Sequence, residues 1–186
     1  HDITNSEVAT PAQTIYLGGG TPSLLSPEQI DRILTACRNT FALDPAAEIT
    51  LEANPNGVDE TWFAGVRATG VNRLSIGAQT FDRKGLRVLG RQHEASDVIA
   101  AVTAARAGGF ENVSLDLIFG WPGQTLDQWK HDLETILAFP GGPPEHCSLY
   151  SLIVEPGTPM ADAVTRGVLT VIDDDDAADL YETAMD

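Results

Sequence analysis

Short segments with the composition of β-strands alternate along the chain with longer segments that have helical periodicity. The strand-like segments are Thr14–Leu17, Glu48–Ala53, Arg73–Ala78, Asn112–Phe119 and Cys147–Ile153. Helices are predicted between and after them, at Pro27–Thr40, Glu60–Ala68, Ala95–Ala107, Leu126–Ala138 and from about Asp175. Because each helix returns the chain to the same end of the sheet, this order predicts a parallel sheet with right-handed crossovers.

The strands of this predicted sheet are polar along one side, which is unusual for parallel strands covered by helices on both faces. One side carries aliphatic residues such as Leu51, Ile76 and Leu115. The other side carries polar or small residues: Thr50, Glu52, Asn54, Ser75, Gly77, Gln79, Ser114, Asp116, Ser148 and Tyr150. A closed eight-stranded barrel fills its interior with branched aliphatic side chains. The pattern therefore predicts an incomplete, open (β/α) barrel of the TIM-like type, with outer helices and a wet or ligand-filled cavity.

The length and the ends of the chain indicate one domain of a longer protein. The 186 residues suit a single hydrophobic core. The first residue is His1 rather than methionine, and the last residues lie in a plausible helix without a capping signal. We therefore expect an N-terminal flank (1–11), a partial barrel (12–155) and the start of a connection to a further C-terminal domain (156–186).

Charge and cysteine content limit the classes of partner. Eleven basic and 27 acidic residues give a formal net charge of −16, which argues against nucleic acid or an anionic membrane surface as the main partner. No apolar segment reaches the length of a membrane span, and nothing resembles a signal peptide. We expect a cytoplasmic protein in which Cys37 and Cys147 are small core residues.

Three consecutive glycines follow the first predicted strand. Gly18, Gly19 and Gly20 precede Thr21-Pro22. Ser26 followed by a proline predicts the start of the next helix. Glycine tolerates positive φ and lets a ligand lie directly against the main chain. Open α/β folds bind their ligands at this end of the strands. A tight turn without a ligand explains the glycines equally well. The case for a ligand therefore depends on the other residues predicted near the turn.

Four polar side chains are predicted at the same edge of the sheet as this turn. Glu52 and Gln79 end the second and third strands, and Asp116 interrupts an apolar strand. Arg91 is either the ionic partner of Asp116 or a bidentate site for a ligand carboxylate. Each residue alone also has a purely structural explanation as a salt-bridge partner. Together, they suit a ligand with an amino group, a carboxylate and ribose hydroxyls.

Several ordered segments resemble the motifs of one known family. They are Gly18–Ser23, Leu51–Pro55, Ser75–Gln79, Leu115–Thr125, Ser148–Leu152 and Glu155–Pro159. The family is the radical S-adenosylmethionine (radical SAM) proteins of the oxygen-independent coproporphyrinogen III oxidase type. Within it, the residues of these motifs resemble the haem chaperone branch, HemW, more closely. The resemblance runs from about Thr14 to Pro159. Trp121 stands where the family usually has leucine, which we interpret as a change in packing.

The resemblance implies a binding site for S-adenosylmethionine made of residues from successive strand ends. These residues are Gly19, Gly20, Thr21, Glu52, Gln79, Arg91, Asp116 and Ile153. The glycine turn and the glutamate would contact the methionyl group, and the arginine its carboxylate. The glutamine and the aspartate would contact the ribose region, and the main chain of the isoleucine the adenine.

The family also holds a [4Fe–4S] cluster with a Cys-x3-Cys-x2-Cys segment just before the glycine turn, because cluster iron binds thiolate sulfur. This sequence has no such segment, and Cys37 and Cys147 have neither its spacing nor its position. The resemblance therefore implies the cluster in the intact protein, while the chain alone is not expected to generate a radical.

Three functions stay open at this point. The resemblance implies a haem chaperone that delivers haem to acceptor proteins, or an oxidase that decarboxylates the propionates of a porphyrinogen to vinyl groups. Either would need an electron donor, and haem or a porphyrin(ogen) would be the ligand. A third possibility is a phosphate-binding (β/α) enzyme whose glycine turn holds a phosphate.

Overall fold

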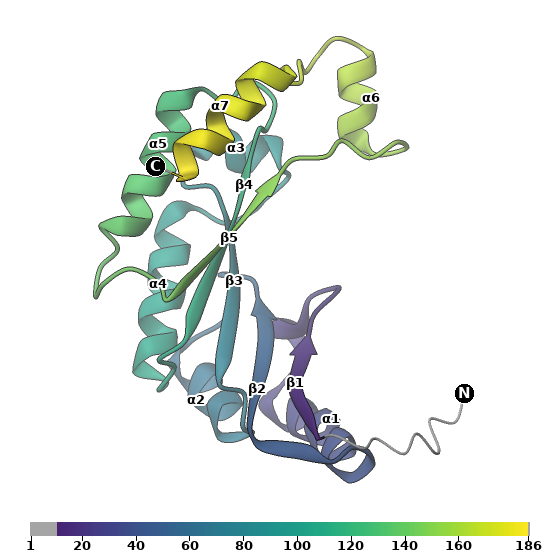
Figure 1. Cartoon of the computed structure of the whole chain (residues 1–186), viewed down its shortest axis with the longest axis vertical. Helices are drawn as coiled ribbons and strands as arrows, with labels where there is room; N and C mark the ends of the chain where they lie inside the picture. The colour runs from purple at the N-terminus through teal and green to yellow at the C-terminus, as the bar shows by residue number, and fades with distance from the viewer. Residues whose placement is uncertain (1–10, 186) are drawn as a thin grey trace.

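The computed structural model describes residues 11–185, and its central feature is a curled parallel sheet (Figure 1). The strands lie in the sheet in the order in which they follow in the chain. They are β1 (Ala12–Leu17), β2 (Leu43–Ala53), β3 (Arg73–Gln79), β4 (Val113–Phe119) and β5 (His146–Ser151). Each neighbouring pair is parallel. The predicted open barrel is confirmed, because the described strands curve round part of a cylinder and do not close on themselves.

Helices connect the strands, and two further helices follow the last strand in the chain. They are α1 (Pro27–Thr40), α2 (Glu60–Ala68), α3 (Arg83–Val88), α4 (Ala95–Ala107), α5 (Leu126–Leu137), α6 (Pro159–Thr165) and α7 (Asp174–Met185). A short 3-10 turn, η1 (Pro22–Leu24), follows the glycines. Capping boxes fix the starts of α1 and α5, at Ser26 and Thr125. The sequence did not predict the short helices α3 and α6. None of the described helices is long and apolar enough to cross a membrane.

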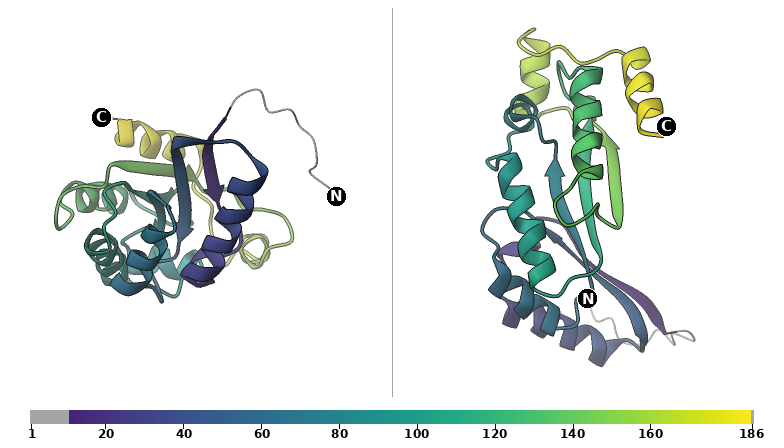
Figure 2. Two further views of the ribbon diagram at one scale, coloured as in Figure 1. Left: turned by 90° about the horizontal axis from the view of Figure 1, so that it is seen from below. Right: turned by 90° about the vertical axis from the view of Figure 1, so that its left-hand side faces the viewer.

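The hydrophobic core lies between the convex face of the sheet and the helices. Figure 2 shows α1, α2, α4 and α5 along this outer side. The aliphatic side chains of the inner strands point into this layer, where Leu51, Leu74, Ile76, Leu115 and Leu117 are fully buried. Each such side chain contributes about 1.5–3 kcal/mol relative to an exposed position. This layer holds the backbone of each strand firmly, and thereby the direction of the polar side chains on the opposite face.

The C-terminal segment also packs onto the sheet layer. In α7, Leu180 is buried, and its carbonyl accepts a 2.8 Å hydrogen bond from Nε1 of the buried Trp129 on α5. The ring of Tyr181 lies 6.4 Å from that of Phe119 at the end of β4. The predicted boundaries between flank, barrel and C-terminal connection stay predictions, and residues 1–10 of the flank lie outside the described residues.

A buried carboxylate ties α5 to the segment that follows β3. Asp132 has no exposed surface, and it accepts hydrogen bonds from the Thr80 hydroxyl at 2.6 Å and the Phe81 amide at 2.8 Å. Burial raises the pKa of Asp132 from 3.8 to about 6, although both of these hydrogen bonds oppose the rise. Asp132 therefore fixes the chain directly after Gln79, the last residue of β3.

We expect Asp132→Leu to destabilise the chain by about 3 kcal/mol, because the Thr80 hydroxyl and the Phe81 amide would lose their acceptor. Between about pH 4 and about pH 6, the folded state retains a proton that the unfolded state has lost, so the contribution of this group to stability falls as the pH rises. Asp132→Asn should cost less and abolish that fall. Urea unfolding at several pH values measures both effects. A leucine variant as stable as the parent would contradict this role.

Candidate functional site

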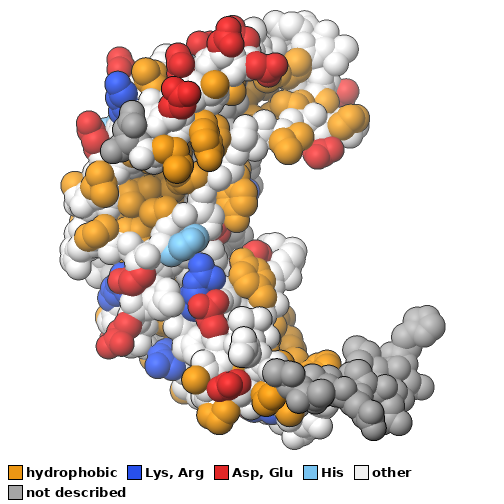
Figure 3. Space-filling view, in the orientation of Figure 1, with side chains coloured by type: hydrophobic (Ala, Val, Ile, Leu, Met, Phe, Trp, Pro, Cys, Tyr) orange, Lys and Arg blue, Asp and Glu red, His pale blue; other side chains and the backbone are white. Residues whose placement is uncertain are grey.

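A pocket of about 270 Å³ opens at the carboxyl ends of the strands on the concave side of the sheet. Figure 3 shows this side as the hollow in the right-hand outline of the molecule. The pocket lining comes from the end of β2, from β3, β4 and β5, and from two connecting loops. The lining residues are Gly20, Thr21, Pro22, Glu52, Ala53, Asn54, Ser75, Gly77, Gln79, Arg91, Asp116 and Tyr150.

The glycine turn forms one wall of the pocket and is tied to Glu52. Gly19 and Gly20 have φ values of 81° and 63°, a left-handed conformation that glycine adopts without a steric penalty. The Gly19 amide donates a 3.1 Å hydrogen bond to Glu52 Oε2. Beyond the turn, the Ser23 hydroxyl accepts a hydrogen bond from the Asn54 amide, at 3.1 Å. These bonds fix the turn against the end of β2.

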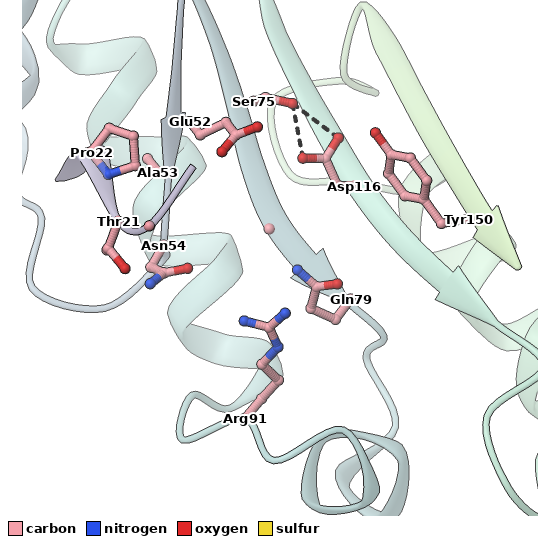
Figure 4. A pocket seen from close by; sticks show the side chains of 12 residues that line it. Thr21, Pro22, Glu52, Ala53, Asn54, Ser75, Gln79, Arg91, Asp116 and Tyr150 are labelled. Carbon is pink, nitrogen blue, oxygen red and sulfur yellow. Dashed lines mark hydrogen bonds between the residues drawn. The ribbon is translucent and has the colours of Figure 1, made fainter. Parts of the chain in front are cut away.

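Asp116 occupies the floor of the pocket. The Ser75 hydroxyl lies 2.9 Å from both carboxylate oxygens of Asp116 (Figure 4). Burial raises the pKa of Asp116, hydrogen bonds from Ser75 and Ser148 oppose the rise, and the charge of Glu52 adds to it. The site therefore holds two carboxylates that repel each other, and a ligand with donor groups relieves that repulsion.

Gln79 ends β3 in an unusual conformation. Its φ is 66°, and it is the one non-glycine residue with positive φ in the described chain. The pairing of β3 with β4 shifts between Gly77 and Gln79, and a Cβ on Gly77 would lie 2.7 Å from Nε2 of Gln79. The side chain thus folds back over the glycine into the pocket, where it is 8% exposed. Strain of this kind persists where the surroundings hold it, here through Asp132.

Arg91 extends into the pocket from the loop after α3. Its guanidinium lies beside Gln79 (Figure 4), and its own amide is anchored to the Leu86 carbonyl at 2.8 Å. Within the described chain, the guanidinium makes no ion pair or side-chain hydrogen bond. Arg91 is therefore not the partner of Asp116, which leaves its donors free for a ligand carboxylate. His93 next to it is structural, because it is buried and its Nε2 lies 3.0 Å from the Ala78 carbonyl oxygen.

The structure brings together six of the eight predicted site residues. Gly20, Thr21, Glu52, Gln79, Arg91 and Asp116 all line the pocket. Gly19 does not line the pocket and uses its amide to hold Glu52. Ile153 follows β5, is 74% exposed and does not line the pocket. Trp121 is fully buried against Gly85, with Lys84 5.7 Å from the ring centre, which supports the interpretation as packing.

Sequence reasoning missed several residues of the pocket as site residues. Asn54, Ser75, Gly77 and Tyr150 line it, and the Tyr16 hydroxyl contacts Glu52 at its edge. The signal that could have found the first four was present in the alternation of polar residues along the strands.

The donors and acceptors of the pocket determine what it can bind. Two carboxylates can accept from an ammonium group and from hydroxyls, a free guanidinium can hold a carboxylate, and the glycine turn exposes main chain. A phosphate would be repelled by Glu52 and Asp116. No group of three or more His, Cys, Asp or Glu among residues 11–185 could hold a metal ion. Cys37 on α1 and Cys147 on β5 are unsuited to ligate an iron–sulfur cluster together.

Comparison with known proteins gives relatives over most of the chain. A heme chaperone HemW from Lactococcus lactis is 40% identical over 174 residues, covering 94% of this chain and 45% of that protein. A heme chaperone HemW from Mycobacterium tuberculosis is 42% identical, covering 94% and 44%. The mouse mitochondrial radical S-adenosyl methionine domain-containing protein 1 is 39% identical, covering 91% and 38%. The chain thus spans less than half the length of these relatives.

Solved structures give the same fold. The coproporphyrinogen III oxidase HemN from Escherichia coli superimposes with a TM-score of 0.77 at 26% identity, covering 93% of this chain and 39% of that one. The archaeal Elp3 from Methanocaldococcus infernus gives a TM-score of 0.75 at 22% identity, covering 94% and 45%, which shows the fold alone. The model of the radical SAM superfamily matches residues 6–136. The fold, the polar pocket and this match agree: the chain belongs to the radical SAM superfamily.

Proposed function

We propose that the intact protein is a radical SAM haem chaperone that binds S-adenosylmethionine in the pocket described above. The observation that carries the proposal is the convergence in one pocket of the glycine turn, two carboxylates and a guanidinium that has no partner among the described residues. The names of the relatives, heme chaperone HemW, support the same conclusion. The oxidase alternative rests on the more distant likeness to HemN.

In this proposal each side chain meets a different part of the ligand. Glu52, with the main chain at Gly20 and Thr21, receives the amino group of the methionyl moiety. Arg91 holds the carboxylate of that moiety through paired hydrogen bonds. Gln79 and Asp116 bind the ribose hydroxyls, since an amide and a carboxylate accept hydrogen bonds from them. The main chain near Ile153, at the same end of the sheet, meets the adenine.

The [4Fe–4S] cluster belongs to this proposal through the family. Its cysteine ligands are not among the described residues, so the part of the chain described here contributes the ligand pocket rather than the cluster site. When bound in the intact protein, the cluster would supply the electron that cleaves the sulfonium bond. The intact protein would act in the cytoplasm, receive electrons from a donor protein and pass haem to acceptor proteins.

The chaperone and the oxidase differ in what they do to a tetrapyrrole. We expect the intact protein to bind haem and transfer it to an apo-acceptor, and to leave coproporphyrinogen III unchanged under anaerobic reducing conditions with S-adenosylmethionine. Absorbance spectroscopy follows haem binding, and chromatography of the porphyrins detects decarboxylation. A vinyl product would favour the oxidase, and failure to bind haem would contradict the chaperone.

Binding of S-adenosylhomocysteine tests the pocket itself. We expect Arg91→Gln to weaken its affinity by about tenfold to a hundredfold, because a charge-assisted pair of hydrogen bonds to the ligand carboxylate is lost. Arg87→Gln on α3 is the matched control, since Arg87 is exposed and does not line the pocket. Isothermal titration calorimetry with ribose 5-phosphate as a second ligand separates the phosphate-binding alternative. Tighter binding of the sugar phosphate would contradict the proposal.

The raised pKa of Asp116 predicts a pH dependence of this binding. The ionised carboxylate accepts from ribose hydroxyls, whereas the protonated acid loses acceptor capacity. We expect affinity for S-adenosylhomocysteine to fall as the pH is lowered from neutral into the acid range, and the fall to begin at a higher pH than an unperturbed aspartate would give. Asp116→Asn should weaken binding at the higher pH and flatten this profile. Asp179→Asn, an exposed change on α7, should leave the profile unchanged. An unaltered profile in Asp116→Asn would exclude Asp116 as its source.

A further inference from the structure

Tyr16 makes a contact that the proposed function does not use. Its ring is 55% exposed on β1, yet its hydroxyl donates a 2.9 Å hydrogen bond to Glu52 Oε1. The other oxygen of the same carboxylate accepts from the Gly19 amide at 3.1 Å. Glu52 is therefore held at both oxygens by the chain itself, which fixes the direction of its remaining lone pairs.

Gly18 lies directly against this contact. Gly18 does not have a positive φ, so backbone conformation does not explain the first glycine of the turn. A Cβ at this position would lie 2.7 Å from Cε1 of Tyr16 and 2.9 Å from Oε1 of Glu52. Real Cβ contacts are not this short, so any larger residue would push the tyrosine and the carboxylate apart. A glycine at this position leaves the room in which these two side chains meet.

The floor of the pocket lies beside this contact. Ser75 is the partner of Glu52 in the register of β2 and β3, and its hydroxyl lies 2.9 Å from both oxygens of Asp116. Burial raises the pKa of Tyr16 to about 12, and its hydrogen bond to Glu52 and the charges of Glu52 and Asp116 add to the rise. The hydroxyl thus stays protonated at neutral pH and remains a donor to Glu52.

We infer that Tyr16 is a positioning residue that orients Glu52 toward the amino group of the ligand. This inference rests on the proposed function. Without the hydroxyl, Glu52 keeps its contact with Gly19 and loses its second anchor, so the carboxylate rotates and the amino group finds a less ordered acceptor. The effect is confined to the amino-acid end of the ligand, because the ribose region meets Gln79 and Asp116.

Two ligands separate this role from a purely structural one. S-adenosylhomocysteine carries the amino-acid end, whereas 5′-methylthioadenosine has the nucleoside and the sulfur without it. In the intact protein, we expect Tyr16→Phe to weaken binding of S-adenosylhomocysteine by about tenfold and to change binding of 5′-methylthioadenosine by less than about twofold. A tyrosine that merely stabilises the fold would affect both ligands alike. Isothermal titration calorimetry measures both affinities.

A double-mutant cycle links the effect to Glu52. In the Glu52→Gln background, Tyr16→Phe should have little further effect on S-adenosylhomocysteine, because the charged acceptor that it orients is gone. Tyr181→Phe is the matched control, since it removes the same atom from a tyrosine that is 56% exposed on α7. It should leave both affinities at the parental value.

The outcomes distinguish the inference from the function on which it rests. If the parent protein binds S-adenosylhomocysteine and Tyr16→Phe binds it equally well, the positioning role is overturned and the proposed function stands. An equal loss for both ligands, or full additivity with Glu52→Gln, also overturns it. If the parent protein fails to bind S-adenosylhomocysteine, the result contradicts both the proposed function and the role of Tyr16 that rests on it.

Discussion

Helices cover one face of the sheet, and this one-sided burial governs the rest of the structure. The apolar side chains of the strands, such as Leu51, Ile76 and Leu115, are fully buried on the convex side. Since successive residues of a strand point to opposite faces, the neighbours of these side chains must face the concave side. Packing on one face therefore positions polar groups on the other, where two carboxylates are brought close enough to interact.

Bringing these carboxylates together has an electrostatic cost, and the surrounding groups reduce it. Glu52 accepts from a tyrosine hydroxyl and a glycine amide, while Asp116 lies against the Ser75 hydroxyl. These donors are neutral, so the pocket keeps its negative charge and retains its attraction for an amino group. Arg91, which has no ionic partner in the part of the chain that the structure describes, supplies the opposite charge at the rim. The pocket is thus polarised along its length, which suits a zwitterionic amino acid joined to a nucleoside.

Much of the fold was predictable because its signals are local. The periodicity of the strands and the main helices, the capping residue at Ser26 and the alternation of polar residues all act over a few positions. The short helices α3 and α6 were missed, since six or seven residues show too little periodicity to be recognised. Six predicted site residues share the pocket because the carboxyl ends of parallel strands meet at one edge.

The sequence by itself determined the parallel order of the strands, the polar lumen and the kinds of side chain at its rim, because each follows from spacing along the chain. The tertiary structure alone decided which groups touch. Among residues 11–185 it left Arg91 without an ionic partner, gave Asp116 a serine as its partner, and placed the Tyr16 hydroxyl on Glu52, 36 positions along the chain. It also showed that Gly18 leaves space for that contact and does not supply a positive φ. Such contacts depend on distances between strands, which no local pattern of residues records.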